Sequence, residues 1–504
     1  METPIHSVIL ANIRKGCRWG QRILAGLLTN AKLGSKVAKH SRDHFSHSVD
    51  DLSEDSILTP VLCAEYWDRV WTLQEFALPK RSLVLGKYIT ISADHFWYSQ
   101  WLLQRLEGKG SGSSGYCFHV SLRTWLHDTM DSRNAKGGRE PYQLLGSGSE
   151  EGVLEKLLGD MRALKATDAK DKVFALQALL QAAGFDIGPP DYSKSVAVVY
   201  AETTRKIIKA TSSLNVLTLA TTIPASAEMP SWVPDWSGES YPSFAKCDTE
   251  LPRATEASTY TDDSEAGTME LNVQGIVMGI VEEVSRHCMT WRVDPSTLTD
   301  PVSSSNPDLW KDVLAYFVRL SQSWVDMAGL TKPYSEWTDE FWKRQECLAS
   351  VLLAMVLNTQ VAESPAAVHD EICRIIQLIC EGDPSSAYYT EDFRTLIQSE
   401  FMDSPAFRAY FTIAHNKPLC KRLNSLYLAN YKRSIFRTKD FLGCGLHSLQ
   451  KGDLLVLLKG GNMPFIVSST VEGWHLRGPA FVPGLMQGEA WPESEDRLTT
   501  FKLV

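Results

Sequence analysis

The chain has 504 residues, a formal net charge of −9 and hydrophobic residues at 44% of its positions. This composition is ordinary for a globular protein, and the length favours two to four domains over one compact core. The negative charge gives no electrostatic case for nucleic-acid binding by the whole chain. No apolar run approaches the roughly 20 residues that span a bilayer, so we expect no transmembrane segment.

Residues 1–59 are basic, with few acidic side chains before position 45. Apolar residues that include Val8, Ile9 and Ile13 can share one helix face. A transit peptide or an interfacial helix would also be basic. Because the apolar spacing is irregular, we favour a helix packed on the rest of the protein, followed by a polar linker.

A helix is expected from Leu62 to Leu78, where Trp67 and Trp71 are four residues apart and would share one face. Glu75 lies at the margin of that face, and Pro79 ends the helix. A carboxylate held against tryptophan at an α/β unit is a candidate catalytic group. The plainer alternative is a solvated residue beside a core-packing helix. We expect Trp71→Ala to destabilise the protein by roughly 3–5 kcal/mol through loss of core packing.

Short strands and helices are expected to follow. Strands are expected at Arg81–Gly86 and Lys87–Ile91, and a helix from Ser92 to Leu106. Further helices are expected at Val153–Leu164, Asp171–Leu180 and Ser195–Ile208, with a strand at Leu214–Leu219. Asp168 and Asp171 stand at the start of one helix, where carboxylates accept hydrogen bonds from unpaired backbone amides.

Two tryptophans recur around a proline in Trp232-Val233-Pro234-Asp235-Trp236. This segment should be extended, because residues before proline avoid the α region. Trp232 and Trp236 could form a ligand platform, but an aromatic clasp that closes two subdomains is the commoner use of such a segment. Leu271–Val284 then alternates enough for a pair of strands.

The second half changes from helical to β-rich. Helices are expected at Phe341–Leu357, Ala366–Ile379 and Glu391–Glu400, preceded by helical spacing from Trp310 to Trp324. Strands are expected at Leu454–Leu458, Phe465–Val467, Trp474–Leu476 and Ala480–Val482, which suits a small barrel or closing sheet.

The ten cysteines are scattered singly and show no zinc-site spacing. We therefore expect no metal, and reduced thiols in a cytoplasmic protein. No Ser/His/Asp or Cys/His signature is evident.

Five blocks in order resemble the fungal heterokaryon incompatibility (HET) domain and the region that follows it. They are Trp67–Glu75 with Leu83–Gly86 and Ile91–Phe96, then Ala166–Leu176, Pro190–Ser195, Pro230–Ser237 and Gly452–Gly461. The motif positions that we take as structural are Trp67, Arg69, Asp168, Asp171, Asp191, Tyr192, Trp232, Pro234, Asp235 and Trp236.

The resemblance implies a fold similar to Toll/interleukin-1 receptor (TIR) domains. Some of these cleave NAD with a glutamate four residues after a tryptophan, the spacing of Trp71 and Glu75. Glu75 would then be catalytic, and Trp71 would wall the substrate pocket. The two central-strand motifs of a full HET domain do not occur before Tyr66. We therefore expect a truncated or divergent HET domain without NAD hydrolase activity.

The resulting fold class is α/β plus α+β: a partial TIR-like α/β unit, a mixed middle region, a helical insert and a small C-terminal β-subdomain. The expected boundaries are 1–59, 60–106, 107–300, 301–432 and 433–504. The implied function is self/non-self recognition and cell-death signalling through protein partners or self-association, with no cofactor. The alternatives are an NAD-cleaving enzyme that uses Glu75, or a non-enzymatic accessory protein of a metabolic or biosynthetic gene cluster.

Overall fold

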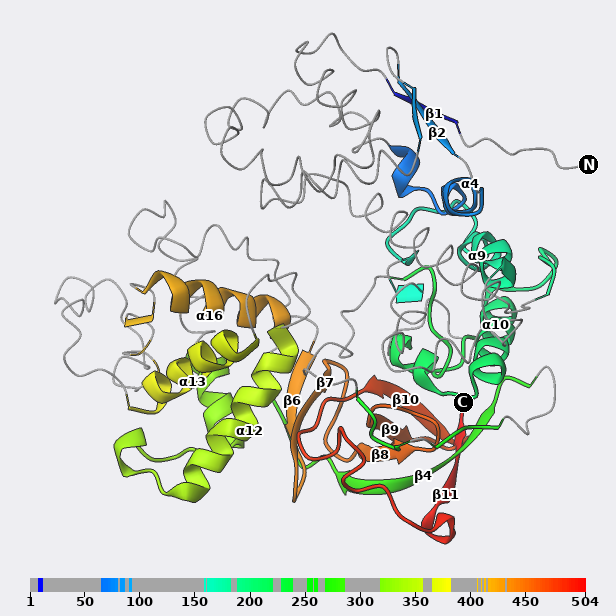
Figure 1. Ribbon diagram of the computed structural model, residues 1–504. Helices are drawn as coiled ribbons and strands as arrows, with labels where there is room; N and C mark the ends of the chain where they lie inside the picture. Colours follow the sequence, from blue (N-terminus) through cyan, green and yellow to red (C-terminus); the bar gives the residue numbers. More distant parts are fainter. Residues whose placement is uncertain are drawn as a thin grey trace, which may run out of the picture. The chain divides into compact units, whose positions relative to one another are not determined.

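The computed structural model describes two compact units (Figure 1). The first comprises Met1–Ala210 and Trp236–Ser240, and the second Thr211–Asp235 and Tyr241–Val504. Both contain helices and strands, in agreement with the expected mixed α/β class. The described residues are 8–11, 65–79, 82–86, 90–92, 158–159, 161–182, 188–220, 228–238, 252–256, 258–261, 268–285, 318–356, 365–381, 406, 409, 412–413, 416–430 and 433–504.

The first unit has a three-stranded sheet in the order β1-β2-β3. β2 (Leu83–Gly86) pairs in parallel with β1 (Val8–Ala11) and antiparallel with β3 (Thr90–Ser92). β2 and β3 match the two expected strands. β1 corrects the helix predicted around Val8. The segment contains β-branched residues, and β2 offers its backbone groups a partner that sequence periodicity does not reveal.

The predicted tryptophan helix is wrong as one continuous element. The chain forms a 3-10 turn, η2 (Glu65–Asp68), and then a separate six-residue helix, α4 (Thr72–Ala77). Between them Arg69 bridges to Lys165, and the Val70 N–H donates to the Lys165 carbonyl oxygen at 3.0 Å. This distant pairing uses backbone groups that a continuous helix would need. Trp67 and Trp71 therefore do not share a face.

Two longer helices of the first unit agree with the predictions. They are α9 (Asp171–Ala182) and α10 (Val196–Thr211). α4 packs against α9, and the Gln74 side-chain amide donates to the main-chain oxygens of Phe174 at 3.3 Å and Ala175 at 2.9 Å.

The second unit contains a closed five-stranded barrel. Its strands are β4 (Leu271–Ile280), β8 (Leu454–Leu458), β9 (Phe465–Ser469), β10 (Trp474–Pro479) and β11 (Thr499–Leu503). All its pairings are antiparallel except β10 with β11. The expected small barrel is thus present. It also uses β4 from the predicted middle region, so residues 433–504 do not close it alone.

Two local predictions in this unit are wrong. Leu214–Leu219 is mostly a 3-10 helix, η3 (Asn215–Leu219), because the Leu217 N–H bonds locally to the Leu214 oxygen instead of to a neighbouring strand. Ala480–Val482 is not a strand either, since only Phe481 forms a bridge, to Cys444.

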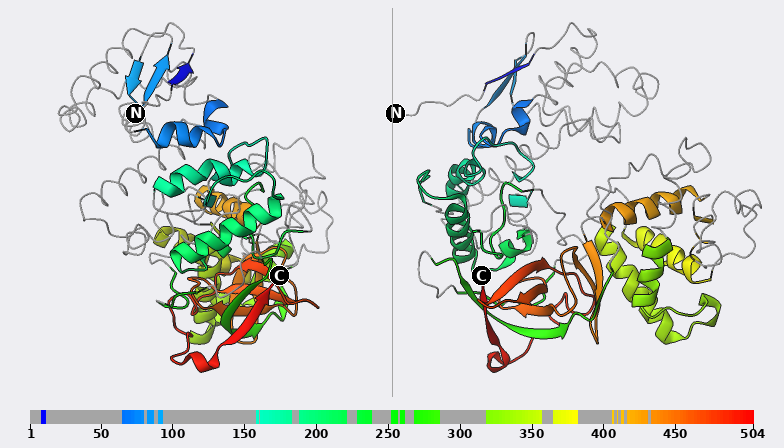
Figure 2. Two further views of the ribbon diagram at one scale, coloured as in Figure 1. Left: turned by 90° about the vertical axis from the view of Figure 1, so that its right-hand side faces the viewer. Right: turned by 180° about the vertical axis from the view of Figure 1, so that it is seen from behind.

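A second sheet of this unit has the order β5-β6-β7. It consists of β5 (Glu283–Val284), β6 (Arg433–Arg437) and β7 (Leu442–Leu446). β7 contacts both β10 of the barrel and helix α12 (Asp339–Val356), so the sheet joins the barrel to the helices (Figures 1 and 2).

The helical part of this unit confirms two predicted helices, α12 and α13 (Pro365–Glu381). α16 (Lys417–Asn430) packs on both, residues 318–327 are also helical, and η5 (Tyr334–Glu336) and η6 (Glu495–Arg497) are short 3-10 turns. The buried Arg433 donates from Nη1 to the oxygens of Ala354 at 3.1 Å and Met355 at 3.4 Å, near the end of α12.

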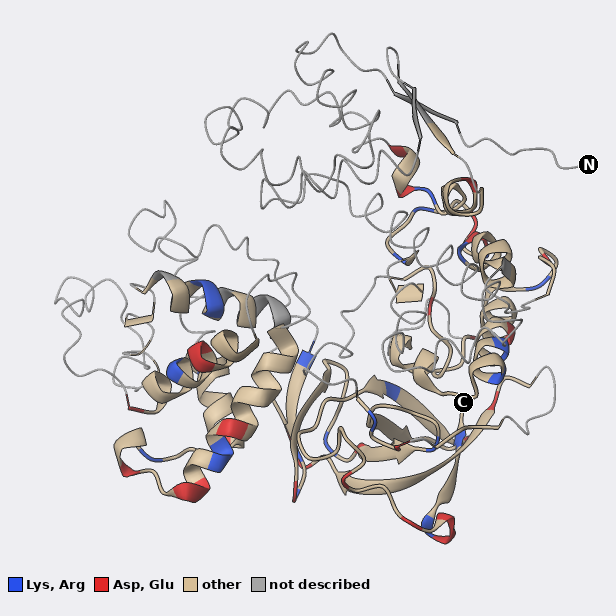
Figure 3. Ribbon diagram, viewed as in Figure 1, with Lys and Arg blue, Asp and Glu red and all other residues tan. Residues whose placement is uncertain are grey.

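The described helices and strands carry acidic and basic positions interspersed (Figure 3). Among them we find no helix with the length and apolar character needed to cross a membrane. The helix expected at Glu391–Glu400 lies outside the described residues, as does all but Ser92 of the helix expected at Ser92–Leu106. Half of Val153–Leu164 is described: residues 158, 159 and 161 are helical, and 162–164 form a turn and bend.

Candidate functional site

The two candidate catalytic residues of the first unit lie at the surface. Trp71 is 36% exposed and Glu75 is also exposed. Glu75 interacts with Tyr66, the residue that precedes the first resembling block. Burial raises the pKa of the Tyr66 hydroxyl, and the charge of Glu75 and a hydrogen bond to its carboxylate raise this pKa further. Glu75 is therefore a surface carboxylate that interacts with the phenol group of Tyr66. It is not a carboxylate buried against an indole ring.

Trp67 is the core residue of the motif. Its side chain is fully buried and makes edge-to-face contacts with Tyr66 at 5.0 Å and Phe76 at 5.2 Å between ring centroids. Arg69 is exposed, and its backbone forms the bridge to Lys165. Trp67 thus packs in the core of the motif, and Arg69 takes part in the motif through its backbone.

The structure brings two of the sequence blocks together at the start of α9. The Tyr192 hydroxyl donates to Oδ1 of Asp171 at 2.7 Å. Lys170 donates from Nζ to the Tyr192 main-chain oxygen at 2.9 Å. The hydrogen bond to Asp171, helped by partial burial and the charges of Asp171 and Asp168, raises the pKa of Tyr192 to about 12.

Asp168 and Asp191 each order a short turn. Asp168 Oδ1 accepts from the Lys170 N–H at 2.9 Å, as predicted for a carboxylate at a helix start. Asp191 Oδ1 accepts from the Ser193 hydroxyl at 2.6 Å and from its N–H at 2.9 Å, and these bonds lower the pKa of Asp191. The hydrogen bonds of Asp168, Asp171, Asp191 and Tyr192 thus position the start of α9 and the turn before α10.

The tryptophan–proline segment is buried throughout. Trp232 and Trp236 are 0% and 1% exposed, and Pro234 and Asp235 are buried between them. The Trp232 indole N–H donates to the Met269 oxygen at 3.0 Å. Neither indole has an open face, so the ligand-platform alternative is excluded and a packing role remains.

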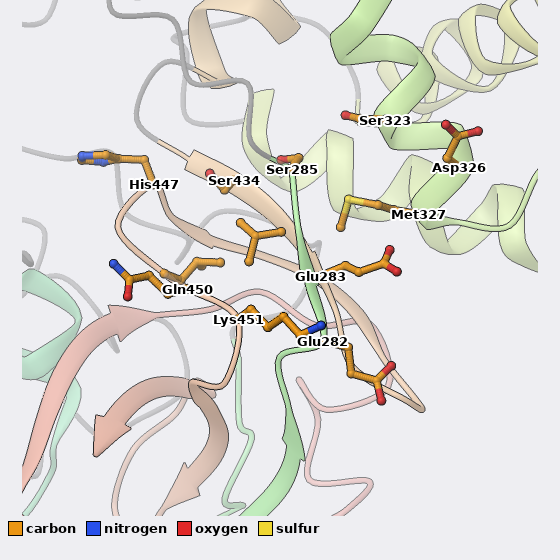
Figure 4. Close-up of a pocket in the computed structure, with 12 residues that line it drawn as sticks. Glu282, Glu283, Ser285, Ser323, Asp326, Met327, Ser434, His447, Gln450 and Lys451 are labelled. Atoms are coloured by element: carbon orange, nitrogen blue, oxygen red, sulfur yellow. The ribbon is translucent and has the colours of Figure 1, made fainter. Parts of the chain in front are cut away.

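A pocket of about 690 Å³ lies in the second unit beside β5 and β6 (Figure 4). Its lining residues are Glu282, Glu283, Val284, Ser285, Ser323, Asp326, Met327, Ser434, His447, Leu449, Gln450 and Lys451. The sequence motifs indicated none of them, because they come from four separate segments that only the fold brings together.

Most polar groups of this pocket bond to neighbouring parts of the fold. Glu283 pairs with Arg437 at 2.7 Å, and Asp326 accepts from the Gln322 amide at 2.9 Å. In Figure 4 the His447 ring points away from Ser434. The pocket therefore does not assemble a nucleophile with a base, and its carboxylates suit a cationic group better than an anion.

A third group of chemically active side chains lies between α12 and α13. One ligand atom each from Glu346, His369 and Cys373 lies within 4.8 Å of the others. The signal available in the sequence was the His369–Cys373 spacing of four on a predicted helix, which places both on one face. Glu346 comes from the other helix, so the set was missed.

Comparison with protein-family models, with curated proteins and with solved structures finds no match to the chain.

Proposed function

We propose that the chain is a HET-like protein of fungal self/non-self recognition and cell-death signalling that acts by protein association without cleaving NAD. The five sequence blocks support the family, and the α/β character of the first unit is compatible with a partial TIR-like fold. The observation that carries the proposed mode of action is the exposure of Trp71, 36%, beside the exposed Glu75.

Cleavage of a glycosidic bond by Glu75 would require the carboxylate and the indole to enclose the ribose and exclude water. Both side chains instead face solvent. An exposed tryptophan is a common anchor of protein interfaces, because it buries a large area at a small cost in side-chain entropy. Leu83 and Tyr192 of the same unit are exposed as well, at 39% and 49%. We take a second copy of the α/β unit as the partner.

The test is sedimentation velocity of the full chain over a range of concentrations. Trp71→Ala should weaken self-association by about tenfold or more, as interface tryptophans commonly do. Trp342→Ala is the matched control, because Trp342 is 40% exposed and lies in the second unit. A monomeric wild-type chain, or equal weakening by the two substitutions, would contradict the proposal.

NAD cleavage is the second candidate, and one observation favours it. β1 and β2 are parallel, and ligands of open α/β sheets bind beyond the carboxyl ends of parallel strands. The test is chromatographic measurement of NAD loss with the purified chain and with Glu75→Gln. Turnover that Glu75→Gln abolishes would establish this function, whereas absence of turnover supports the association role.

A further inference from the structure

The pair α12 and α13 places three potential metal ligands next to one another. Nε2 of His369 lies 3.3 Å from Oε2 of Glu346, and Nδ1 lies 3.7 Å from the Cys373 sulfur. Cys373 and His369 are one helix turn apart on α13, and Glu346 lies on α12, which packs against it. The three side chains thus converge where the two helices meet. The buried faces of both helices belong to one hydrophobic core.

We propose that Glu346, His369 and Cys373 bind a divalent transition-metal ion of the zinc type, with the fourth position open to water. Carboxylate oxygen, imidazole nitrogen and thiolate sulfur are all zinc ligands, and three protein ligands with one open position is a common arrangement. Ligands about 2.0–2.3 Å from a tetrahedral ion lie roughly 3.3–3.7 Å apart. The Nε2–Oε2 separation of 3.3 Å falls in this range, and one ligand atom from each of the three residues lies within 4.8 Å of the others. Only one ring nitrogen binds a given ion, so metal binding would require the imidazole to rotate until that nitrogen faces both Glu346 and Cys373.

The surroundings of the three side chains also favour a cation. Glu346 and Asp370 both lie close enough to Cys373 for their negative charges to act on its thiol. The Glu346 side chain is 62% exposed and that of His369 23%, so an ion can enter from solvent.

Gln345 supplies an independent observation beside the site. It is 1% exposed, and its amide nitrogen donates to the Cys373 main-chain oxygen at 3.1 Å. Its side-chain oxygen has no hydrogen-bond partner among the residues that the structure describes. A buried acceptor without a partner is costly, and a metal-bound water or an imidazole N–H would supply the missing donor.

The same three residues could instead form a catalytic triad with Cys373 as nucleophile, His369 as base and Glu346 as its partner. The electrostatic environment of Cys373 disfavours this alternative. Burial, followed by the charges of Glu346 and Asp370, raises the pKa of Cys373 to about 12. Reactive thiols require a lowered pKa. A metal ion, in contrast, binds the thiolate and displaces its proton on binding.

The test is titration of the metal-free full chain with Co²⁺, followed by absorption spectroscopy. We expect a thiolate-to-cobalt charge-transfer band and its displacement by Zn²⁺. Cys373→Ser should abolish the band. His369→Ala and Glu346→Gln should weaken binding by at least roughly tenfold, since even residues that only support a ligand have effects of that size.

Cys380→Ser is the matched control, because Cys380 is a half-buried thiol two helix turns further along α13. It should leave the band unchanged. Glu346→Gln changes an exposed residue, so it tests the site without disturbing the core. Zn²⁺ should also raise the Tm of the wild-type chain and not that of Cys373→Ser. Absence of the band, or a band that survives Cys373→Ser, would overturn the proposal.

Discussion

The Ser231 N–H donates to the main-chain oxygen of Val504 at 2.9 Å, across 273 positions of the sequence. The Ser231 hydroxyl donates to the same oxygen and accepts from the Leu476 N–H in β10 at 2.9 Å. β10 and β11 share only the pair Trp474–Leu503, so the barrel closes there with few ladder bonds. Ser231 links the two strands at this weak point.

Ser231→Ala should therefore destabilise the barrel. The substitution leaves the buried Leu476 N–H unsatisfied, which costs about 1–3 kcal/mol. Urea unfolding followed by tryptophan fluorescence measures the loss. Thr470→Ala is the comparison, because Thr470 is an exposed hydroxyl that bonds only locally, to Gly473. Equal losses from the two changes would contradict the role of Ser231 in closure.

The two tryptophans of the first motif should differ sharply in their contribution to stability. Trp67→Ala removes a fully buried side chain and should cost about 3–5 kcal/mol. Trp71→Ala should cost much less, which corrects the expectation from the sequence, because Trp71 is 36% exposed. Denaturant midpoints of both variants check this. A Trp71→Ala loss as large as that of Trp67→Ala would contradict the structure of the motif.

The helices and strands whose apolar pattern is visible within their own segment were predicted correctly from the sequence. The apolar stripes of α10, α12 and α13 and the buried strand β8 are visible within each segment. Predictions failed where a distant partner decides the backbone. Lys165 divides the tryptophan helix, and β2 turns Val8–Ala11 into a strand.

The candidate sites show the same limit. Trp71 and Glu75 were selected from the spacing that the resemblance to TIR domains implies and from a helix that would align them with Trp67, and the divided helix removes that alignment. Cys373 and His369 have a visible spacing, but Glu346 joins them only because α12 packs on α13. Strand β6 was not predicted, and neither was β7, whose strand pattern is weakened by Gly443 and Gly445.

Gly443 in β7 occupies a position where no larger residue fits. A Cβ there would lie 2.8 Å from the Phe481 main-chain oxygen and 2.9 Å from Cζ of Phe436. The Phe481 oxygen is fixed by its bond to the Cys444 N–H, so it cannot move away. Gly443→Ala should therefore cost about 1–3 kcal/mol through overpacking. An unchanged midpoint in urea would show that the sheet adapts without strain.

Asp453, in the turn before β8, should make the stability of the barrel depend on pH. The residue is 4% exposed, and Oδ2 accepts from the Gln450 N–H at 2.7 Å. Burial raises the pKa of Asp453 above its usual 3.8, and the Gln450 bond and Arg477 only partly oppose this shift. As the pH rises from about 3.8, the unfolded chain loses this proton before the folded protein does. The folded protein thus binds more protons in this window, so its stability falls with rising pH until the raised pKa is passed.

Asp453→Asn should remove this dependence. Asparagine has no charge to desolvate, and its side-chain oxygen still accepts from the Gln450 N–H. The free energy of unfolding of the variant, relative to the wild type, should therefore increase as the pH rises from about 4 towards neutrality and then level off. Urea midpoints of both proteins over a pH series measure the difference. Two curves that stay parallel throughout would mean that Asp453 titrates alike in the folded and unfolded chains, and that its burial is fully compensated by Gln450 and Arg477.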